Sequence, residues 1–229
     1  MKHGLLTTIC SCVIGIACAQ LTGVDANNNL RNADVSMFRS FDNRYEGVKG
    51  TPTIFDDFVR GSVNMKKGNK VVGQELNYDA VANELITRSK VYNKILAVRS
   101  DLIESFELIS PDGDTLLFKK ATDKGFCQKI YEGKKLNLYF RHVKQLSKAN
   151  YGGGYNSNAR NYDEFVDASE YIFSVNDSSP EVIKPSRKAF EKKLPQSKDL
   201  ISGYFKEHSP DLKNHRELAA FLAYLDQNS

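Results

Sequence analysis

Between residue 51 and about residue 184, apolar and polar positions alternate with a period of two. The segment LNLYFR at 136–141 shows the pattern clearly, because two leucines and a phenylalanine alternate with asparagine, tyrosine and arginine. Turn residues separate such segments, and SPDGD at 110–114 is the clearest turn, since proline presets φ and glycine accepts a positive φ. Roughly eight to ten short strands follow one another at intervals of about eight to twelve residues. The pattern predicts an antiparallel β-meander that forms a barrel, a half-barrel or a sandwich.

The period changes near residue 185, where helical spacing replaces alternation. Ser186 and Ser197 are placed to cap two short helices, and Asn214 with Glu217 three residues later matches a capping box. The residues after Glu217 carry apolar side chains at i, i+3, i+4 and i+7, which indicates an amphipathic helix. The sequence therefore predicts two or three C-terminal helices packed on the sheet. Strands followed by helices give an α+β fold that is mainly β.

The N-terminal region has a different character from the rest of the chain. Residues 1–19 combine a basic start, an apolar run and a small-x-small site ending at Ala19, which predicts a secretory signal peptide cleaved after that residue. A lipoprotein signal with Cys18 as the lipidated residue is the alternative, although Gly15 stands where such signals usually carry an aliphatic residue. The predicted organisation is a signal peptide at 1–19, a flexible lead-in at 20–50, a β domain at 51–184 with a loop insertion at 147–167, and a helical segment at 185–229.

Charge and hydropathy restrict the partners that we expect. The whole chain has a net charge of +4, and removal of the signal with its one lysine leaves 31 − 28 = +3. The basic residues are scattered as pairs among acidic residues, which is typical of a solvated surface rather than a nucleic-acid groove. No segment after the signal approaches the ~20 apolar residues of a membrane helix. We expect an exported protein that binds no nucleic acid and has no transmembrane segment.

Candidate catalytic residues are few. Cys127 is the one cysteine outside the signal, and its apolar surroundings predict a buried structural thiol rather than a nucleophile. His142 is expected as a surface ring, and His208 and His215 as polar rings at helix ends. No histidine or cysteine has the spacing of a zinc site, and the chain has no GxSxG motif. The sequence predicts no catalytic residue, no metal ligand and no cofactor.

The stretch ANYGGGYNSNARNY at 149–162 contains three consecutive glycines between two tyrosines. It lacks the Lys-Ser/Thr of a phosphate-binding loop, and period-two segments flank it, so we interpret it as an insertion between two strands. Aromatic side chains in such an insertion either contact a sugar, a lipid or a partner protein, or hold the insertion against its own sheet. The candidate partner contacts are Tyr151, Tyr155, Tyr162 and Phe165.

A concave sheet face is the other candidate binding surface, because curved antiparallel sheets enclose apolar ligands when their inner face is not filled. The aromatic residues predicted to line such a ligand are Tyr78, Phe106, Tyr131 and Phe140, with Phe118 beside them. These residues also suit an ordinary hydrophobic core. A deep apolar groove would favour a carrier, whereas a filled core would favour a protein-interaction role.

Residues 49–88 resemble a family of exported proteins common in Bacteroidetes-type bacteria. The similar features are the KGTP entry at 49–52, the acidic-aromatic step at 55–58, the GSV strand at 61–63, and LNY at 76–78 leading to NEL at 83–85. The segments GFCQKIYEGKKLNLYFRH, SEYIFSV and HRELAAFLAYLDQ also fit in order. The resemblance implies an exported β-rich protein of the bacterial envelope, and it implies no activity or catalytic residues.

Three functional hypotheses follow. The first is a non-enzymatic exported protein of the bacterial envelope, periplasmic or secreted, that binds an apolar or lipid-like ligand on a curved sheet. The second is an adhesin or envelope-assembly protein that acts through the 147–167 loop. The third and least favoured is a hydrolase whose carboxylates meet only in the fold. The sequence specifies neither the partner nor the oligomeric state.

Overall fold

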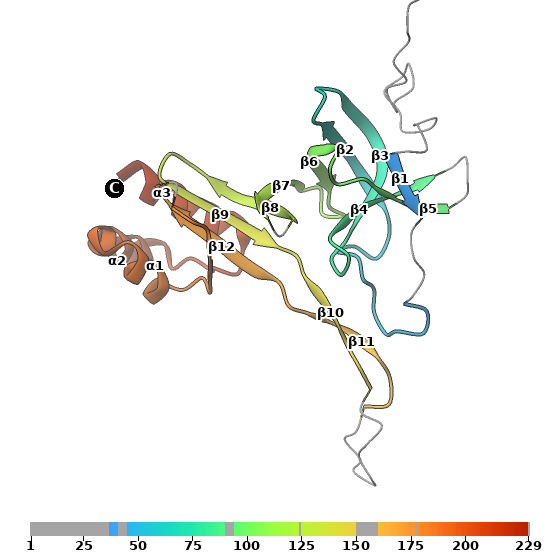
Figure 1. The fold of residues 1–229 in the computed structure, drawn as a ribbon. Coiled ribbons are helices and arrows are strands. Elements are labelled where there is room, and N and C mark those ends of the chain that lie inside the picture. The colour runs from blue at the N-terminus through green and yellow to red at the C-terminus, as the bar shows by residue number, and fades with distance from the viewer. Residues whose placement is uncertain are drawn as a thin grey trace, which may run out of the picture.

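The computed structural model describes residues 37–40, 45–89, 94–123, 125–149, 160–176 and 178–228. Eleven of their strands form one antiparallel sheet (Figure 1). In order across the sheet these strands are β1 (Phe38–Ser40), β5 (Lys94–Val98), β4 (Glu84–Ser89), β3 (Lys70–Asp79), β2 (Val59–Met65), β6 (Ile103–Ile109), β7 (Thr115–Thr122), β8 (Gly125–Glu132), β9 (Leu136–Arg141), β12 (Glu170–Val175) and β13 (Glu181–Ile183). The α+β class, with a large antiparallel sheet followed by helices, is confirmed.

The sheet is open, with β1 and β13 at its edges. Strand β1 lies inside the predicted lead-in at 20–50, where its three residues pair with β5 and Met37 is buried. The prediction of a loose lead-in is therefore wrong for residues 37–40, and the part before residue 37 lies outside the described residues.

The half of the sheet from β1 to β6 curls strongly. Strands β5 and β6 are separated by three other strands in the sheet order, which in a flat sheet would place them about 19 Å apart. Only residues 99–102 connect them, and these form a tight turn in which the N–H of Leu102 donates to the carbonyl oxygen of Arg99 at 3.1 Å. The sheet therefore bends round until β5 and β6 meet at one end, which gives a half-barrel.

The inside of this half-barrel is filled by side chains. Tyr78, Phe106 and Phe118 have no exposed surface, and the rings of Phe106 and Phe118 stack with their centroids 4.7 Å apart. Phe126 from β8 closes the cluster with an edge-on contact of 5.1 Å to Phe106. Burial of this aromatic and aliphatic surface stabilises the first of the two larger hydrophobic cores, and a small third cluster consists of Cys127, Tyr139 and Ile172.

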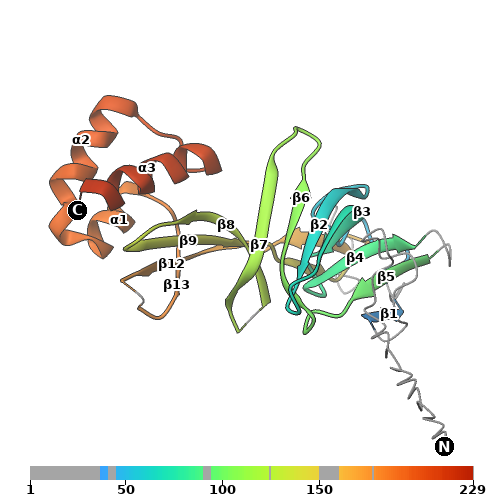
Figure 2. The ribbon, with the colours of Figure 1, turned by 90° about the horizontal axis from the view of Figure 1, so that it is seen from above.

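A second core lies between the other half of the sheet and the helices α1 (Arg187–Lys193), α2 (Lys198–His208) and α3 (His215–Asn228). Figure 2 shows these helices over one end of the sheet, near β8, β9 and β12. Phe173 from β12 and Phe221 from α3 are both fully buried, and Phe190 from α1 contacts both rings. The predicted β domain at 51–184 is thus one sheet that serves two cores, because the helices cover only one of its ends.

The helix ends agree only partly with the predicted caps. The Ser186 side chain accepts a hydrogen bond from the N–H of Ala189, as expected for the start of α1. Ser197 occupies the N-cap position of α2, as predicted, but its buried hydroxyl makes no capping hydrogen bond, and the residue also ends a short 3-10 helix, η3 (Pro195–Ser197). Asn214 caps α3 through its amide oxygen, whereas Glu217 bonds the N–H of Asp211 instead of closing the capping box.

The carboxylate of Asp226 in α3 holds the turn between β8 and β9. It accepts hydrogen bonds from the backbone N–H groups of Lys134, Lys135 and Leu136 at 2.8 to 3.0 Å, and from the hydroxyl of Tyr131 at 3.2 Å. Gly133 passes so close below that an added Cβ would lie 2.3 Å from Asp226 Oδ2. The last helix is therefore fixed to the sheet by polar contacts as well as by the second core.

None of the helices in the described part of the chain combines the length and the apolar character that crossing a membrane requires.

Candidate functional site

A two-stranded hairpin projects from the end of strands β9 and β12. It consists of β10 (Lys144–Ser147) and β11 (Glu164–Asp167), which pair with each other and with no strand of the large sheet. We call the described residues 144–149 and 160–167 the arm; Figure 1 shows it extending away from both cores. The prediction that residues 147–167 connect neighbouring strands is confirmed, since β9 and β12 pair directly. The strands within the insertion were not predicted.

Residues 45–53 run beside the arm and hold it in place from its root to the Ser147–Glu164 pair. The N–H of Lys49 donates to the carbonyl oxygen of Asp163 at 2.9 Å, and the N–H of Phe165 donates to the carbonyl oxygen of Lys49 at 3.1 Å. On the opposite strand, Lys144 Nζ donates to the carbonyl oxygens of Thr51 at 2.8 Å and Thr53 at 2.6 Å. This N-terminal segment thus binds both strands of the arm.

Arg160 closes the far end of the described arm. Its guanidinium donates to the hydroxyl and carbonyl oxygens of Ser147 at 2.6 and 3.1 Å and to the carbonyl oxygen of Lys148 at 2.9 Å. It also pairs with Glu164. Nη2 contacts the last residue of β10 and the residue after it, and Nη1 contacts Glu164 on β11, so the guanidinium links the two sides of the hairpin. The arm is therefore anchored at its root and bridged between its strands.

The arm gives no buried side chain to either core. Every residue of β10 and β11 is partly or largely exposed. Two apolar or aromatic side chains lie on the surface, Tyr162 at 39% and Val166 at 36% exposure. Extensive hydrogen bonding therefore holds an element that adds little to hydrophobic stabilisation.

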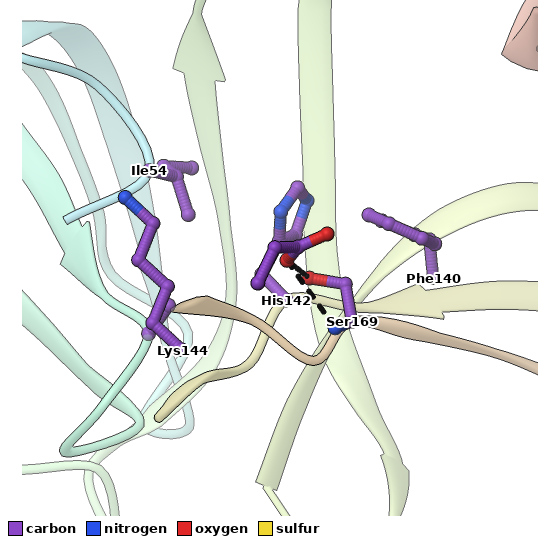
Figure 3. A pocket seen from close by; sticks show the side chains of 7 residues that line it. Ile54, Phe140, His142, Lys144 and Ser169 are labelled. Carbon is purple, nitrogen blue, oxygen red and sulfur yellow. Dashed lines mark hydrogen bonds between the residues drawn. The ribbon is translucent and has the colours of Figure 1, made fainter. Parts of the chain in front are cut away.

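A pocket of about 240 Å³ lies where the arm joins the two cores (Figure 3). We call it the junction pocket. Its lining residues come from three parts of the chain: Ile54 and Ala80 from the half-barrel side, Phe140 and His142 from β9 and its end, and Lys144, Asp167 and Ser169 from the arm and the residue pair after it.

The junction pocket contains serine, histidine and aspartate, but their contacts differ from those of a catalytic triad. Ser169 Oγ donates to Asp167 Oδ1 at 2.5 Å, and the N–H of Ser169 donates to the same oxygen at 3.2 Å. His142 Nε2 lies 2.8 Å from Gln128 Oε1. A triad needs the base on the nucleophile and the carboxylate on the base. Here the carboxylate bonds the serine directly and the imidazole bonds an amide.

His142 is enclosed by its neighbours, so the prediction of a surface ring is wrong. Its ring contacts Phe140 edge-on at 4.7 Å and Phe118 at 5.6 Å. Burial, together with the nearby His215, lowers the pKa of His142 to about 4. The imidazole is therefore neutral at pH 7, and such a weak base is poorly suited to general-base catalysis. Its position depends on residues from other strands, and no local sequence signal indicates it.

The other two histidines lie at helix ends, as predicted. His208 stacks on Tyr204 with ring centroids 4.3 Å apart, at the end of α2. His215 begins α3, and its Nε2 lies 3.0 Å from the hydroxyl oxygen of Tyr171. Burial lowers the pKa of His215, so this ring also favours the neutral form.

The predicted ligand-lining aromatics do not gather on one surface. Tyr78 and Phe106 are fully buried in the first core, so they offer no surface to a ligand. Tyr131 packs at the second core and donates to Asp226. Phe140 alone among these four lines the junction pocket. The concave face that the sequence suggested for an apolar ligand is filled, because aromatic rings from neighbouring strands stack across it.

The four predicted partner-contact residues fall into two groups. Tyr151 and Tyr155 lie outside the described residues. Phe165 packs edge-on against Tyr45 at 5.2 Å, so it helps hold the arm. Tyr162 lies 4.8 Å below Lys49 Nζ and remains exposed.

Cys127 and the surface carboxylates bear on possible chemistry elsewhere. Cys127 is buried, as predicted, and burial raises the pKa of its thiol, which disfavours the thiolate. The carboxylates of Asp57 and Asp114 pair with Arg88 and Arg216 on the surface. Within the described ranges, no group of three or more histidine, cysteine, aspartate or glutamate side chains is arranged to hold a metal ion.

Comparison with known proteins finds no matching family model, no matching curated protein and no matching solved structure.

Proposed function

We propose that this chain is an exported, non-enzymatic binding protein of the bacterial envelope that contacts a partner protein through the arm. Export is supported by the signal-like pattern of residues 1–19 and by the resemblance of residues 49–88 to exported proteins. The observation that carries the binding role is the anchored arm, which is held by backbone and charged contacts yet buries no side chain of β10 or β11.

The arm is anchored by hydrogen bonds although none of the side chains of β10 and β11 is buried, and this combination bears on its function. Elements that stabilise a fold do so mainly through buried apolar area, which the arm lacks. A hairpin fixed at its root presents its side chains with little loss of conformational freedom on binding, which favours affinity. The exposed Tyr162 is the kind of residue that is enriched at protein interfaces.

The filled half-barrel supports this role over that of a lipid carrier. A carrier needs an apolar space, and the aromatic residues predicted to line it are packed against one another. The junction pocket has charged and polar lining residues and lies below the volume typical of drug-sized ligand sites, ≈ 300–1,000 Å³.

Shortening the arm tests the proposal. Ser147 and Glu164 are paired directly, so an Asn-Gly turn can join them and remove residues 148–163 while β10 and β11 remain. We expect the shortened chain to fold and to lose the partner that co-isolates with the full chain from cells that naturally make it.

A control variant shows whether loss of the partner results from loss of the arm or from any change to the protein surface. Ile109 is also exposed, at 43%, but lies on β6 far along the sheet from the arm. The variant Ile109→Ser should retain the partner. Retention of the partner by the shortened chain would contradict the proposed function.

A further inference from the structure

The junction pocket has more hydrogen-bond acceptors than donors available. Asp167 Oδ1 accepts from the N–H and hydroxyl of Ser169, which leaves the second carboxylate oxygen with lone pairs for another donor. The amide oxygen of Gln128 can only accept, so the proton of the neutral His142 ring lies on Nε2. His142 Nδ1 is then an acceptor.

Among the described residues that line the pocket, the cation is Lys144, and its ammonium is engaged by backbone carbonyls. Lys144 Nζ donates to the carbonyl oxygens of Thr51 and Thr53, and Figure 3 shows its side chain reaching toward Ile54 and away from Ser169. An ammonium held by two backbone carbonyls has limited capacity to bind an anionic ligand.

Carboxyl groups outnumber ammonium groups around this position. Burial lowers the pKa of Lys144, and the carboxyls of Asp167, Asp56 and Asp79 act in the opposite direction because they lie close to its ammonium. Of these three carboxyls, Asp167 lines the pocket, and it lies opposite Lys144 in the pairing of β10 with β11. Arg141 is neutralised by its pair with Glu170 at 2.5 Å. Since the ammonium of Lys144 is held by the carbonyls of Thr51 and Thr53, the carboxylate of Asp167 is the charged lining group that remains for a ligand, and it favours a positively charged one.

The remaining wall of the pocket is apolar and aromatic. Ile54, Ala80 and the ring of Phe140 line it. An aromatic face attracts a cation, and aliphatic side chains favour a short hydrocarbon portion beside it. A volume of about 240 Å³ restricts the ligand to a small molecule.

We propose that the junction pocket binds a small molecule with an ammonium group, which forms an ion pair with Asp167, donates a hydrogen bond to His142 Nδ1 and lies against Phe140. Because residues from both cores and from the arm line the pocket, the ligand also bridges the arm to the body of the protein. The proposal is independent of the protein partner of the arm.

The test is a titration of the full chain with small probes, followed by NMR amide shifts and calorimetry. Ethanolamine and methylammonium are the ammonium probes, and ethylene glycol and acetate are the neutral and anionic controls. We expect the ammonium probes to give saturable shifts at the amides of Val143 and Ser169, whereas the controls give none. This comparison uses the unaltered protein, so it does not depend on the folding of a variant.

Two variants then locate the charge that binds the probe. Asp167→Asn keeps an oxygen that can accept from Ser169 but removes the negative charge, and it should weaken ethanolamine binding at least tenfold. Asp112→Asn removes a carboxylate from the distant turn between β6 and β7 and should leave binding unchanged. Saturation by acetate instead of the amines, unchanged binding to Asp167→Asn, or no saturable shift with any probe would overturn the proposal.

Discussion

Lys144 Nζ donates a 2.6 Å hydrogen bond to the carbonyl oxygen of Thr53 and so connects the arm to the segment that leads into β2 of the half-barrel. A second bond of 2.8 Å reaches the carbonyl oxygen of Thr51. Hydrogen bonds that involve a charged group are stronger than neutral ones, and here two of them join segments about ninety residues apart in the sequence. This clamp adds polar anchoring to the packing of Phe165 against Tyr45.

Removal of the clamp should loosen the arm and cost stability. Lys144→Met keeps the aliphatic stem but loses both bonds, and we expect the free energy of unfolding to fall by about 2 kcal/mol. Urea denaturation measures this loss, and hydrogen exchange at residues 49–54 should become faster. Lys148→Met is the control, because that side chain is 77% exposed and its ion pair at 3.6 Å should contribute little. Equal stability of the two variants would contradict the clamp.

Because the interior of the half-barrel is filled, truncation of a large side chain in the first core should lower the free energy of unfolding strongly. Phe106→Ala should destabilise the chain by about 3–5 kcal/mol, because it opens a cavity beside the stacked ring of Phe118. The exposed Tyr162→Ala should change stability by less than about 0.5 kcal/mol. Thermal and urea unfolding of the two variants provide the measurement. A mild effect of Phe106→Ala would indicate an underfilled interior and would revive the carrier hypothesis.

The contact between Asp226 and the β8–β9 turn predicts a pH-dependent contribution to stability. Although burial raises the pKa of Asp226, the N–H groups of Lys134, Lys135 and Leu136 and the hydroxyl of Tyr131 lower it overall. A lowered pKa in the folded state gives a stabilisation that is present above the unfolded pKa of about 3.9 and is lost as the pH falls through the folded value.

Asp226→Asn should therefore destabilise the chain by about 1–2 kcal/mol at pH 7 and by less at pH 3. Urea unfolding at the two pH values gives the difference, with the exposed Asp112→Asn as a control that should change neither value. The same loss at both pH values would show that the carboxylate charge is not what holds the turn.

The lowered pKa of His142 predicts that the folded protein loses stability as the pH falls from 7 to 5, a range above that of Asp226. Its folded pKa of about 4 lies below the ordinary value of 6.5, so the unfolded chain binds more protons between these values. Stability attributable to this ring is complete above pH 6.5 and falls by about 2 kcal/mol between pH 7 and pH 5. The titratable groups around the ring are Asp167, Lys144 and His215, and His215 contributes in the same direction because burial lowers its pKa as well.

The variant His142→Gln isolates this contribution. Its stability at pH 7 should be lower than that of the unaltered chain, but the decrease from pH 7 to pH 5 should be smaller. Urea unfolding at both pH values provides the comparison, and an NMR titration of the ring protons reports the pKa directly. An ordinary pKa near 6.5 in the folded protein would contradict the enclosed position of His142.

The alternation of apolar and polar residues predicted most of the strands, because the residues that form one apolar face of a strand recur at every second position in the sequence. SPDGD at 110–114 forms the β6–β7 turn with Gly113 at φ +86°, as its composition indicates. The same alternation says nothing about which strands share a core, so the division of one sheet between two cores was not predicted. Strand β1 was missed because its three residues are too few to show an alternating pattern, and they form a strand by pairing with β5.

The candidate site was harder to predict from the sequence than the fold was. The insertion at 147–167 was recognisable from its composition, whereas its anchoring depends on Lys49 and Thr53, about a hundred residues earlier. The position of His142 depends in the same way on Gln128 and Phe118 from other strands. Long-range contacts of this kind leave no periodic signal in the chain.

Site-specific photocrosslinking tests most directly whether the arm contacts a partner. A benzoylphenylalanine placed at Tyr162 on the arm, or at Asp112 on the β6–β7 turn as the control, is irradiated in cells that naturally make the protein. The account predicts a discrete crosslinked product of defined mass from position 162 and none from position 112. No product from position 162, or the same products from both positions, would contradict a binding role for the arm.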